Sequence, residues 1–296
     1  NHGPASIMHI GGSGSCRGAI HNTGSLTTRF FRLFGGFTTF SNGYSSAAEG
    51  FVNPYLFGTG SVGTDAETLL QSKMIILWGA NISDTRFSCE LENVIIAAKK
   101  SGVPVIVIDP RKSRSVERLA TDWIPILPGS DTAMMAAILY VLLSDALVDT
   151  GFIQRCTAGF EELKGYILGT HDGQPKSPNW AEAICGVPEQ TIADLARDYG
   201  RTKPTALIPG LSVQRSIGGE EAIRMAVALQ AATGNIGVLG GSSGSAIWGR
   251  LPGPRMPSIG PVVDPGLAAA DVRQLPVYRW PDAVLEGTEG GYPSDI

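Results

Sequence analysis

Two short apolar runs, each followed at once by small, polar or charged residues, form the clearest pattern in the sequence. Residues 74–78 (MIILW) lead into Gly79, Ala80 and Asn81, and residues 105–108 (VIVI) lead into Asp109. Between them, residues 84–101 have the spacing of an amphipathic helix that ends before a glycine. This order predicts a parallel βαβ unit. The carboxyl edge of such a sheet is where open α/β folds bind nucleotide-like ligands.

The same alternation continues along the chain. We expect further strands at 7–10, 123–127 and 205–208, and helices over most of the segment that ends at Phe34 and at 65–71, 130–144, 152–168, 180–199 and 219–232. Residues 35–63, rich in glycine, serine and threonine, are predicted to form an extended ordered loop with one helical turn, and the proline-rich tail from Leu251 to be irregular. The pattern predicts an α/β fold with two Rossmann-like parallel-sheet domains.

Composition excludes several classes of protein. The chain has 296 residues, 43% of them apolar, and a net charge of −4, so there is no broad basic field that would hold nucleic acid. No apolar run approaches the ~20 residues of a membrane span. The four cysteines contain no C-x-x-C pair, and the four histidines form no metal-binding pattern, so neither set predicts a local zinc site or a ferredoxin-type cluster.

Two aspartates follow predicted strands. Asp109 can accept hydrogen bonds from ribose hydroxyls or from a guanine edge, but an aspartate before Pro110 is equally well explained as a turn residue. Asp131, in the string PGSDT, has the same two interpretations, and taken alone it is better explained as a helix cap. No G-x-G-x-x-G or P-loop string occurs, which weakens ordinary dinucleotide and NTPase interpretations.

Basic and amide side chains stand at two predicted strand ends. Arg111, Lys112 and Arg114 follow Asp109 and could face a pyrophosphate, although a solvated surface is the alternative. Gln214 and Arg215 follow the 205–208 strand. An arginine there can grip a phosphate or a carbonyl-rich heterocycle, and an internal pair with a nearby glutamate explains it equally well.

A set of short strings, in order along nearly the whole chain, resembles the molybdopterin oxidoreductases of the dimethyl sulfoxide reductase family. The strings are GYSSAA at 43–48, LWGAN at 77–81, IDPR at 108–111 followed by Ser113, PGSDT at 128–132, PGLSVQR at 209–215 followed by Gly219 and Glu220, and TGNIGVLGG at 233–241. The resemblance rests on their order and spacing.

The resemblance implies molybdenum or tungsten held by two molybdopterin guanine dinucleotides and by one protein ligand. The ligand position falls at Ser45, as in the serine-ligated reductases, and Tyr44 would lie near the oxo group. A serine oxygen is a hard ligand that suits a high-valent metal. The alternative is that Ser45 only begins a helical turn.

The same resemblance implies the cofactor-binding residues. Around one guanine dinucleotide it places Gly79, Ala80, Asn81, Asp109, Arg111, Ser113, Gly129 and Asp131. Near the other dinucleotide or its pterin it places Gly11, Gly12, Gln214, Arg215, Gly234 and Asn235.

In this family one domain is inserted in another. The sequence pattern changes near Asp65 and again near Thr202, which fits that plan. We expect a discontinuous domain of residues 1–64 and 202–296 near the metal and an inserted guanine-dinucleotide-binding domain of residues 65–201. The chain would be the central part of a larger enzyme. An iron–sulfur cluster would belong only to a domain upstream of it.

The implied reaction is reduction of a small S-oxide, N-oxide or oxyanion. The implied partners are an iron–sulfur electron-transfer subunit and a membrane anchor, with a periplasmic or membrane-associated location. Two alternatives stay open. One is a non-redox or dehydrogenase member of the same family; the other is that the isolated chain is an inactive α/β module that binds a nucleotide or a partner.

Overall fold

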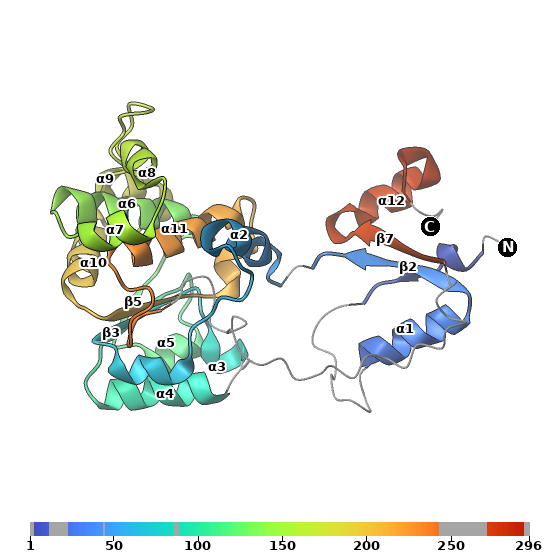
Figure 1. Cartoon of the computed structure of the whole chain (residues 1–296). Helices are drawn as coiled ribbons and strands as arrows, with labels where there is room; N and C mark the ends of the chain where they lie inside the picture. Colours follow the sequence, from blue (N-terminus) through green and yellow to red (C-terminus); the bar gives the residue numbers. More distant parts are fainter. Residues whose placement is uncertain (1–2, 12–22, 44, 86–88, 243–270, 293–296) are drawn as a thin grey trace. The chain divides into compact units, whose positions relative to one another are not determined.

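The computed structural model describes residues 3–11, 23–43, 45–85, 89–242 and 271–292 (Figure 1). The chain divides into two compact units, which we treat separately. One contains residues Asn1–Ala47 and Gly253–Ile296, and the other contains residues Ala48–Pro252. Both are built on parallel sheets, so the predicted α/β class with parallel sheets is confirmed.

The unit 48–252 has a four-stranded parallel sheet in the order β5-β4-β3-β6. Its strands are β3 (Met74–Trp78), β4 (Val105–Ile108), β5 (Asp122–Ile124) and β6 (Thr205–Pro209). Helices α3 (Ile82–Thr85), α4 (Cys89–Lys100) and α5 (Arg114–Leu119) cover one face. The other side carries helices α6 (Asp131–Ser144), α7 (Thr150–Cys156), α8 (Phe160–Ile167), α9 (Pro178–Cys185), α10 (Glu189–Arg201) and α11 (Gly219–Ala232) (Figure 1).

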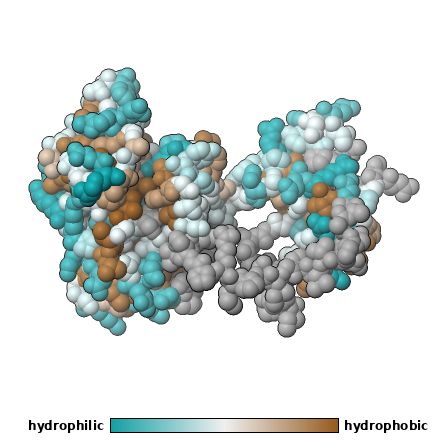
Figure 2. All heavy atoms as spheres, in the orientation of Figure 1, coloured by the Kyte–Doolittle hydropathy of each residue, from teal (hydrophilic) through white to brown (hydrophobic). Residues whose placement is uncertain are grey.

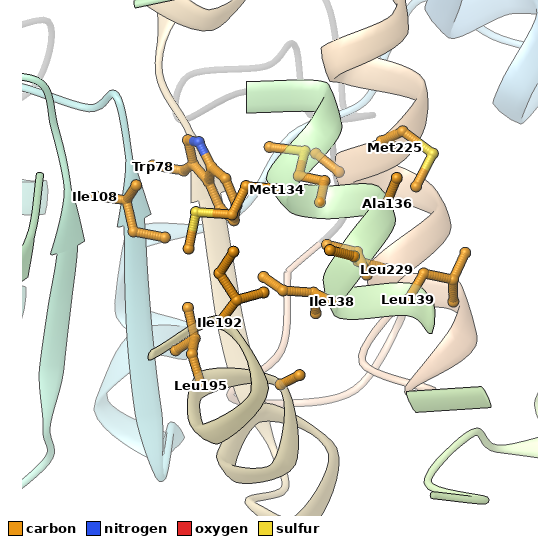
Figure 3. Close-up of a cluster of buried hydrophobic side chains, with 14 of the residues drawn as sticks. Trp78, Ile108, Met134, Ala136, Ile138, Leu139, Ile192, Leu195, Met225 and Leu229 are labelled. Atoms are coloured by element: carbon orange, nitrogen blue, oxygen red, sulfur yellow. The ribbon is translucent and has the colours of Figure 1, made fainter. Parts of the chain in front are cut away.

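Alternate residues of the central strand pack on opposite faces of the sheet. Ile75 and Leu77 join the cluster under α4 and α5, whereas Ile76 and Trp78 join the larger cluster under α6. Figure 3 shows Trp78 beside Met134 of α6 in that larger cluster. Because both faces are buried, a parallel strand reads as a continuous apolar run, which is why β3 and β4 were predictable from sequence.

Two predicted helices each prove to be a pair. The predicted helix 152–168 is α7 and α8, and the predicted helix 180–199 is α9 and α10. Glycines in the left-handed conformation stand at both breaks: Gly159, with φ 77°, precedes α8, and Gly186, with φ 71°, ends α9. The connection between α8 and α9 projects at the top of Figure 1 and is hydrophilic in Figure 2.

The other unit has a three-stranded parallel sheet in the order β1-β2-β7, with β1 (Met8–His9), β2 (Gly36–Ser41) and β7 (Asp271–Pro276). Helices α1 (Thr23–Leu33) and α12 (Trp280–Glu286) accompany it. The predicted loop over 35–63 is wrong, because it contains β2 and α2 (Ala47–Phe57). The predicted irregular tail contains β7 and α12. The strands β2 and β7 pair across more than two hundred residues, a non-local contact that no local pattern announces.

The boundaries of the compact units differ from the predicted domain boundaries. Residues after Thr202 were assigned to the discontinuous domain, but β6 pairs with β3, from Met74↔Thr205 to Trp78↔Pro209. This pairing brings the segment around β6 and α11 into the inserted unit, which ends at Pro252. The first boundary falls at Ala47, near the start of α2, instead of near Asp65.

Candidate functional site

A cavity of about 570 Å³ opens at the carboxyl edge of the four-stranded sheet. Its walls come from the loops after β3, β4 and β6 and from the turn before α6. The lining residues that argue for a ligand are Gly79, Ala80, Asn81, Asp109, Arg111, Gly129, Asp131, Gly210, Ser212 and Arg215. Most of the residues predicted around one guanine dinucleotide therefore lie together here. Ser113 does not line the cavity, whereas Arg215, which the resemblance placed near the other dinucleotide or its pterin, does.

Backbone forms part of this cavity because two of its loops approach each other closely at glycines. Gly79 has φ +59°, and its carbonyl accepts a hydrogen bond from Ser212 Oγ at 2.7 Å. A Cβ atom on Gly210 would lie 2.0 Å from the same carbonyl oxygen. Only glycine fits at this contact, which lets main-chain groups line the cavity closely.

Asp131 lies at the first position of α6 and joins the cavity to the core. The indole Nε1 of Trp78, a fully buried side chain, donates to its Oδ1 at 2.8 Å. Burial raises the pKa of the Asp131 carboxyl above its ordinary value, and the Trp78 hydrogen bond opposes that rise. The side chain is thus a fixed, partly desolvated acceptor at a helix amino end.

Asp109 is buried and is held by its own turn. Its Oδ1 accepts from the backbone N–H of Arg111 at 3.1 Å, and its Oδ2 accepts from Ser113 Oγ at 3.3 Å. Trp123 Nε1 donates to the Asp109 carbonyl at 2.9 Å. The turn interpretation therefore describes its contacts, and the same turn presents Asp109 at the cavity.

Asn81 works within the loop. Its Oδ1 accepts from Ser115 Oγ at 2.9 Å and its Nδ2 donates to Asp84 Oδ2 at 2.8 Å. Ser115 Oγ in turn accepts from the backbone N–H of Ser83 at 2.9 Å. The side chain of Asn81 fixes the geometry between α3 and α5, so what this residue offers a ligand most directly is its backbone.

Three other predicted contacts lie outside this cavity. Asn235 is buried; its Oδ1 accepts from the backbone N–H of Thr205, the first residue of β6, at 3.0 Å. That places Asn235 at the amino end of the strand, opposite the cavity, and Gly234 lies there against the carboxylate of Asp149. Gln214 is buried beside the first turn of α2, where its Oε1 accepts from the backbone N–H of Glu49, and it does not line the cavity.

A second cavity, of about 1130 Å³, lies in the unit with β1, β2 and β7. It brings Gly11 and Ser45 together with threonine hydroxyls of α1 and with two residues that sequence reasoning missed, His9 and Trp280. His9 is the last residue of β1, and Trp280 is the first residue of α12, shortly after β7. Their places at or just beyond the carboxyl ends of parallel strands are the signal that could have found them. Gly12 and Tyr44 lie outside the described residues.

The His9 ring is held by aromatic neighbours. It packs 5.6 Å from Phe31 and 5.9 Å from Phe37, measured between ring centroids. A Cβ atom on Gly11 would lie 2.5 Å from the His9 ring, so Gly11 is required for this packing. Within the part of the chain that the structure describes, no three or more histidine, cysteine or acidic side chains cluster to hold a metal ion, and no helix could cross a membrane.

Comparison with known proteins gives one consistent result. The family model for molybdopterin oxidoreductases matches residues 1–252. The dimethyl sulfoxide reductase DmsA of Haemophilus influenzae is 33% identical over 97% of this chain, and the trimethylamine-N-oxide reductase of the same organism is 35% identical over 78% of it. The chain spans 37% and 29% of these two relatives.

A solved structure shares the fold of this chain. The acetylene hydratase from Pelobacter acetylenicus superposes with a TM-score of 0.57 and 25% identity. The match covers 73% of this chain and 28% of the hydratase chain.

Proposed function

The chain belongs to the molybdopterin oxidoreductases of the dimethyl sulfoxide reductase family, and from this membership we propose that its parent protein binds molybdenum or tungsten with two molybdopterin guanine dinucleotides. The proposed activity is reduction of an S-oxide or N-oxide, as the names of the relatives indicate. When bound, the metal cofactor supplies a two-electron oxygen-atom transfer. The residues of this chain bind and orient the cofactor and its substrate.

The cavity of the four-stranded sheet fits one guanine dinucleotide. Its glycine backbone and the cations of Arg111 and Arg215 suit a diphosphate, and its apolar walls, such as Leu211, suit a base. Asp109 and Asp131 are carboxylate acceptors, and guanine differs from adenine in presenting an adjacent N1–H and amino group to such acceptors. The combination of these groups in one cavity is the observation that carries the proposal.

The second cavity is proposed to receive the metal end of the cofactor. Ser45 Oγ would be the protein ligand of the metal, with Gly11 and Gly12 beside the pterin and Tyr44 near the reacting oxygen. Gln214, Gly234 and Asn235 would act through loop geometry, because Asn235 holds the start of β6 and Gln214 holds α2. The proposed partners are an iron–sulfur electron-transfer subunit and a membrane anchor.

Selectivity for guanine tests the dinucleotide site. We expect cofactor-free protein to bind GDP more tightly than ADP in isothermal titration, and Asp131→Asn to weaken GDP binding by about 10- to 100-fold through loss of an ionised acceptor. Asp198→Asn, on the exposed surface of α10, is the matched control and should leave binding unchanged. Equal binding of GDP and ADP would contradict the assignment.

A non-redox reaction is the second candidate, favoured by the structural likeness to acetylene hydratase. Loaded full-length protein should reduce dimethyl sulfoxide or trimethylamine N-oxide with a dithionite-reduced viologen dye as the electron donor, and Ser45→Ala should abolish this turnover. Hydration of acetylene without sulfoxide reduction would select the second candidate instead. A stably folded parent protein without any pterin would select a simple nucleotide-binding module.

A further inference from the structure

The side chain of Gln214 caps a helix that lies far away in sequence. Gln214 ends the 3-10 turn η3 (Leu211–Gln214) and is 6% exposed. Its Oε1 accepts from the backbone N–H of Glu49 at 2.9 Å, across 165 residues. Glu49 is the third residue of α2 (Ala47–Phe57), and N–H groups of a first helical turn have no partner within their helix. Gln214 therefore supplies the acceptor that a cap residue usually supplies.

The contact belongs to a small buried polar cluster. Asn53, one turn along α2, is 2% exposed, and its Nδ2 donates to Glu49 Oε1 at 3.5 Å. Within the described structure, Gln214 Nε2 has no hydrogen-bond partner. Burying an amide group is costly unless it is hydrogen-bonded. The hydrogen bond to Oε1 is therefore the contact through which this buried side chain stabilises the fold.

We propose that Gln214 is a positioning residue that anchors the amino end of α2 and thereby restricts the segment that leads into it, including Ser45. Ser45 lies two residues before α2, and Arg215, next to Gln214, lines the dinucleotide cavity. One loop thus supplies a cavity residue and holds the helix that follows the proposed metal ligand. The role assigned to Ser45 rests on the proposed function; the anchor itself does not.

Amide hydrogen exchange in the full-length protein tests the anchor without any metal. Gln214→Met keeps the length of the side chain and removes the acceptor, so the Glu49 amide should exchange at least about fivefold faster. Gln190→Met, an exposed glutamine on α10, is the control and should change nothing. Unchanged exchange at Glu49 in Gln214→Met refutes the anchor.

The wild-type protein gives a second test in case Gln214→Met fails to fold. Glu162 occupies the same third position of α8, a helix without a side-chain cap. The Glu49 amide should exchange at least about fivefold more slowly than the Glu162 amide, after correction for intrinsic rates. Equal protection of the two amides refutes the anchor.

Spectroscopy of the loaded protein tests the consequence for Ser45. In Gln214→Met, X-ray absorption of the metal should show loss or disorder of the protein oxygen ligand seen in wild type, while Gln190→Met keeps it. Faster exchange at Glu49 with an unchanged metal spectrum would refute positioning of Ser45. If wild-type protein holds no metal, the proposed function fails, and the exchange results alone decide the anchor.

Discussion

Replacing Trp78 by Phe tests the link between the core and the dinucleotide cavity. The change removes the donor to Asp131 Oδ1 and replaces a fully buried indole by a smaller phenyl ring. A hydrogen bond to an ionised acceptor contributes about 1.5–3 kcal/mol. The missing ring atoms leave roughly 40 Å³ unfilled, which costs about 1 kcal/mol at the usual cavity coefficient. We therefore expect the free energy of unfolding to fall by about 2.5–4 kcal/mol.

Urea unfolding followed by circular dichroism measures this loss. Trp123→Phe is the control, because Trp123 Nε1 donates to a neutral carbonyl, that of Asp109, and the side chain is only half-buried; its cost should be smaller. In an Asp131→Asn background the acceptor is neutral, so Trp78→Phe should cost about 1 kcal/mol less than in wild type. An equal cost in both backgrounds would refute the contribution of the indole–carboxylate bond.

Three further variants test other features of the same unit. Burial raises the pKa of Asp131 above 3.8, so the folded state holds this proton more tightly than the unfolded state, and the stability from this group is lost as pH rises from 3.8 through the raised pKa. Asp131→Asn should therefore stabilise the protein at neutral pH relative to wild type. A series of urea midpoints in which the advantage of Asp131→Asn does not grow with pH contradicts this. The buried Nζ of Lys176 donates to Gln174 O at 2.6 Å and pairs with Asp172. Lys176→Met should lower the free energy of unfolding by about 1.5–3 kcal/mol, measured by thermal unfolding, and an unchanged midpoint contradicts this. Gly210→Ala forces a methyl group against the carbonyl oxygen of Gly79 and should cost at least ~1–3 kcal/mol and abolish GDP binding in the titration assay; retained binding would contradict the backbone contact.

The sequence predicted best where both faces of an element are buried. The strands β3 and β4 are continuous apolar runs, and the helix between them has a clear period, so their positions followed from local pattern alone. The strand β2 was not predicted because its sequence, GFTTFS, has little apolar alternation and its partner β7 lies beyond a long intervening unit. Pairing of that kind depends on tertiary context, which overrides local propensity.

The candidate site divides in the same way. Residues directly after β3 and β4 could be placed at one cavity because the carboxyl ends of parallel strands share an edge. Asn235 could not, since it is held at the amino end of β6 by a tertiary hydrogen bond from Thr205 that no local pattern announces. His9 lies in the predicted strand 7–10 but was missed because the four histidines form no metal-binding pattern. Trp280 was missed because it lies in the segment predicted to be irregular, just after β7.

We propose that this chain forms part of a protein that binds a metal through pterin guanine dinucleotides. The most direct measurement is elemental analysis of the purified full-length protein together with chromatography of the nucleotides released by acid. We predict molybdenum or tungsten with two equivalents of GMP per metal atom. Absence of both metals, or release of a nucleotide other than GMP, would contradict binding of this cofactor.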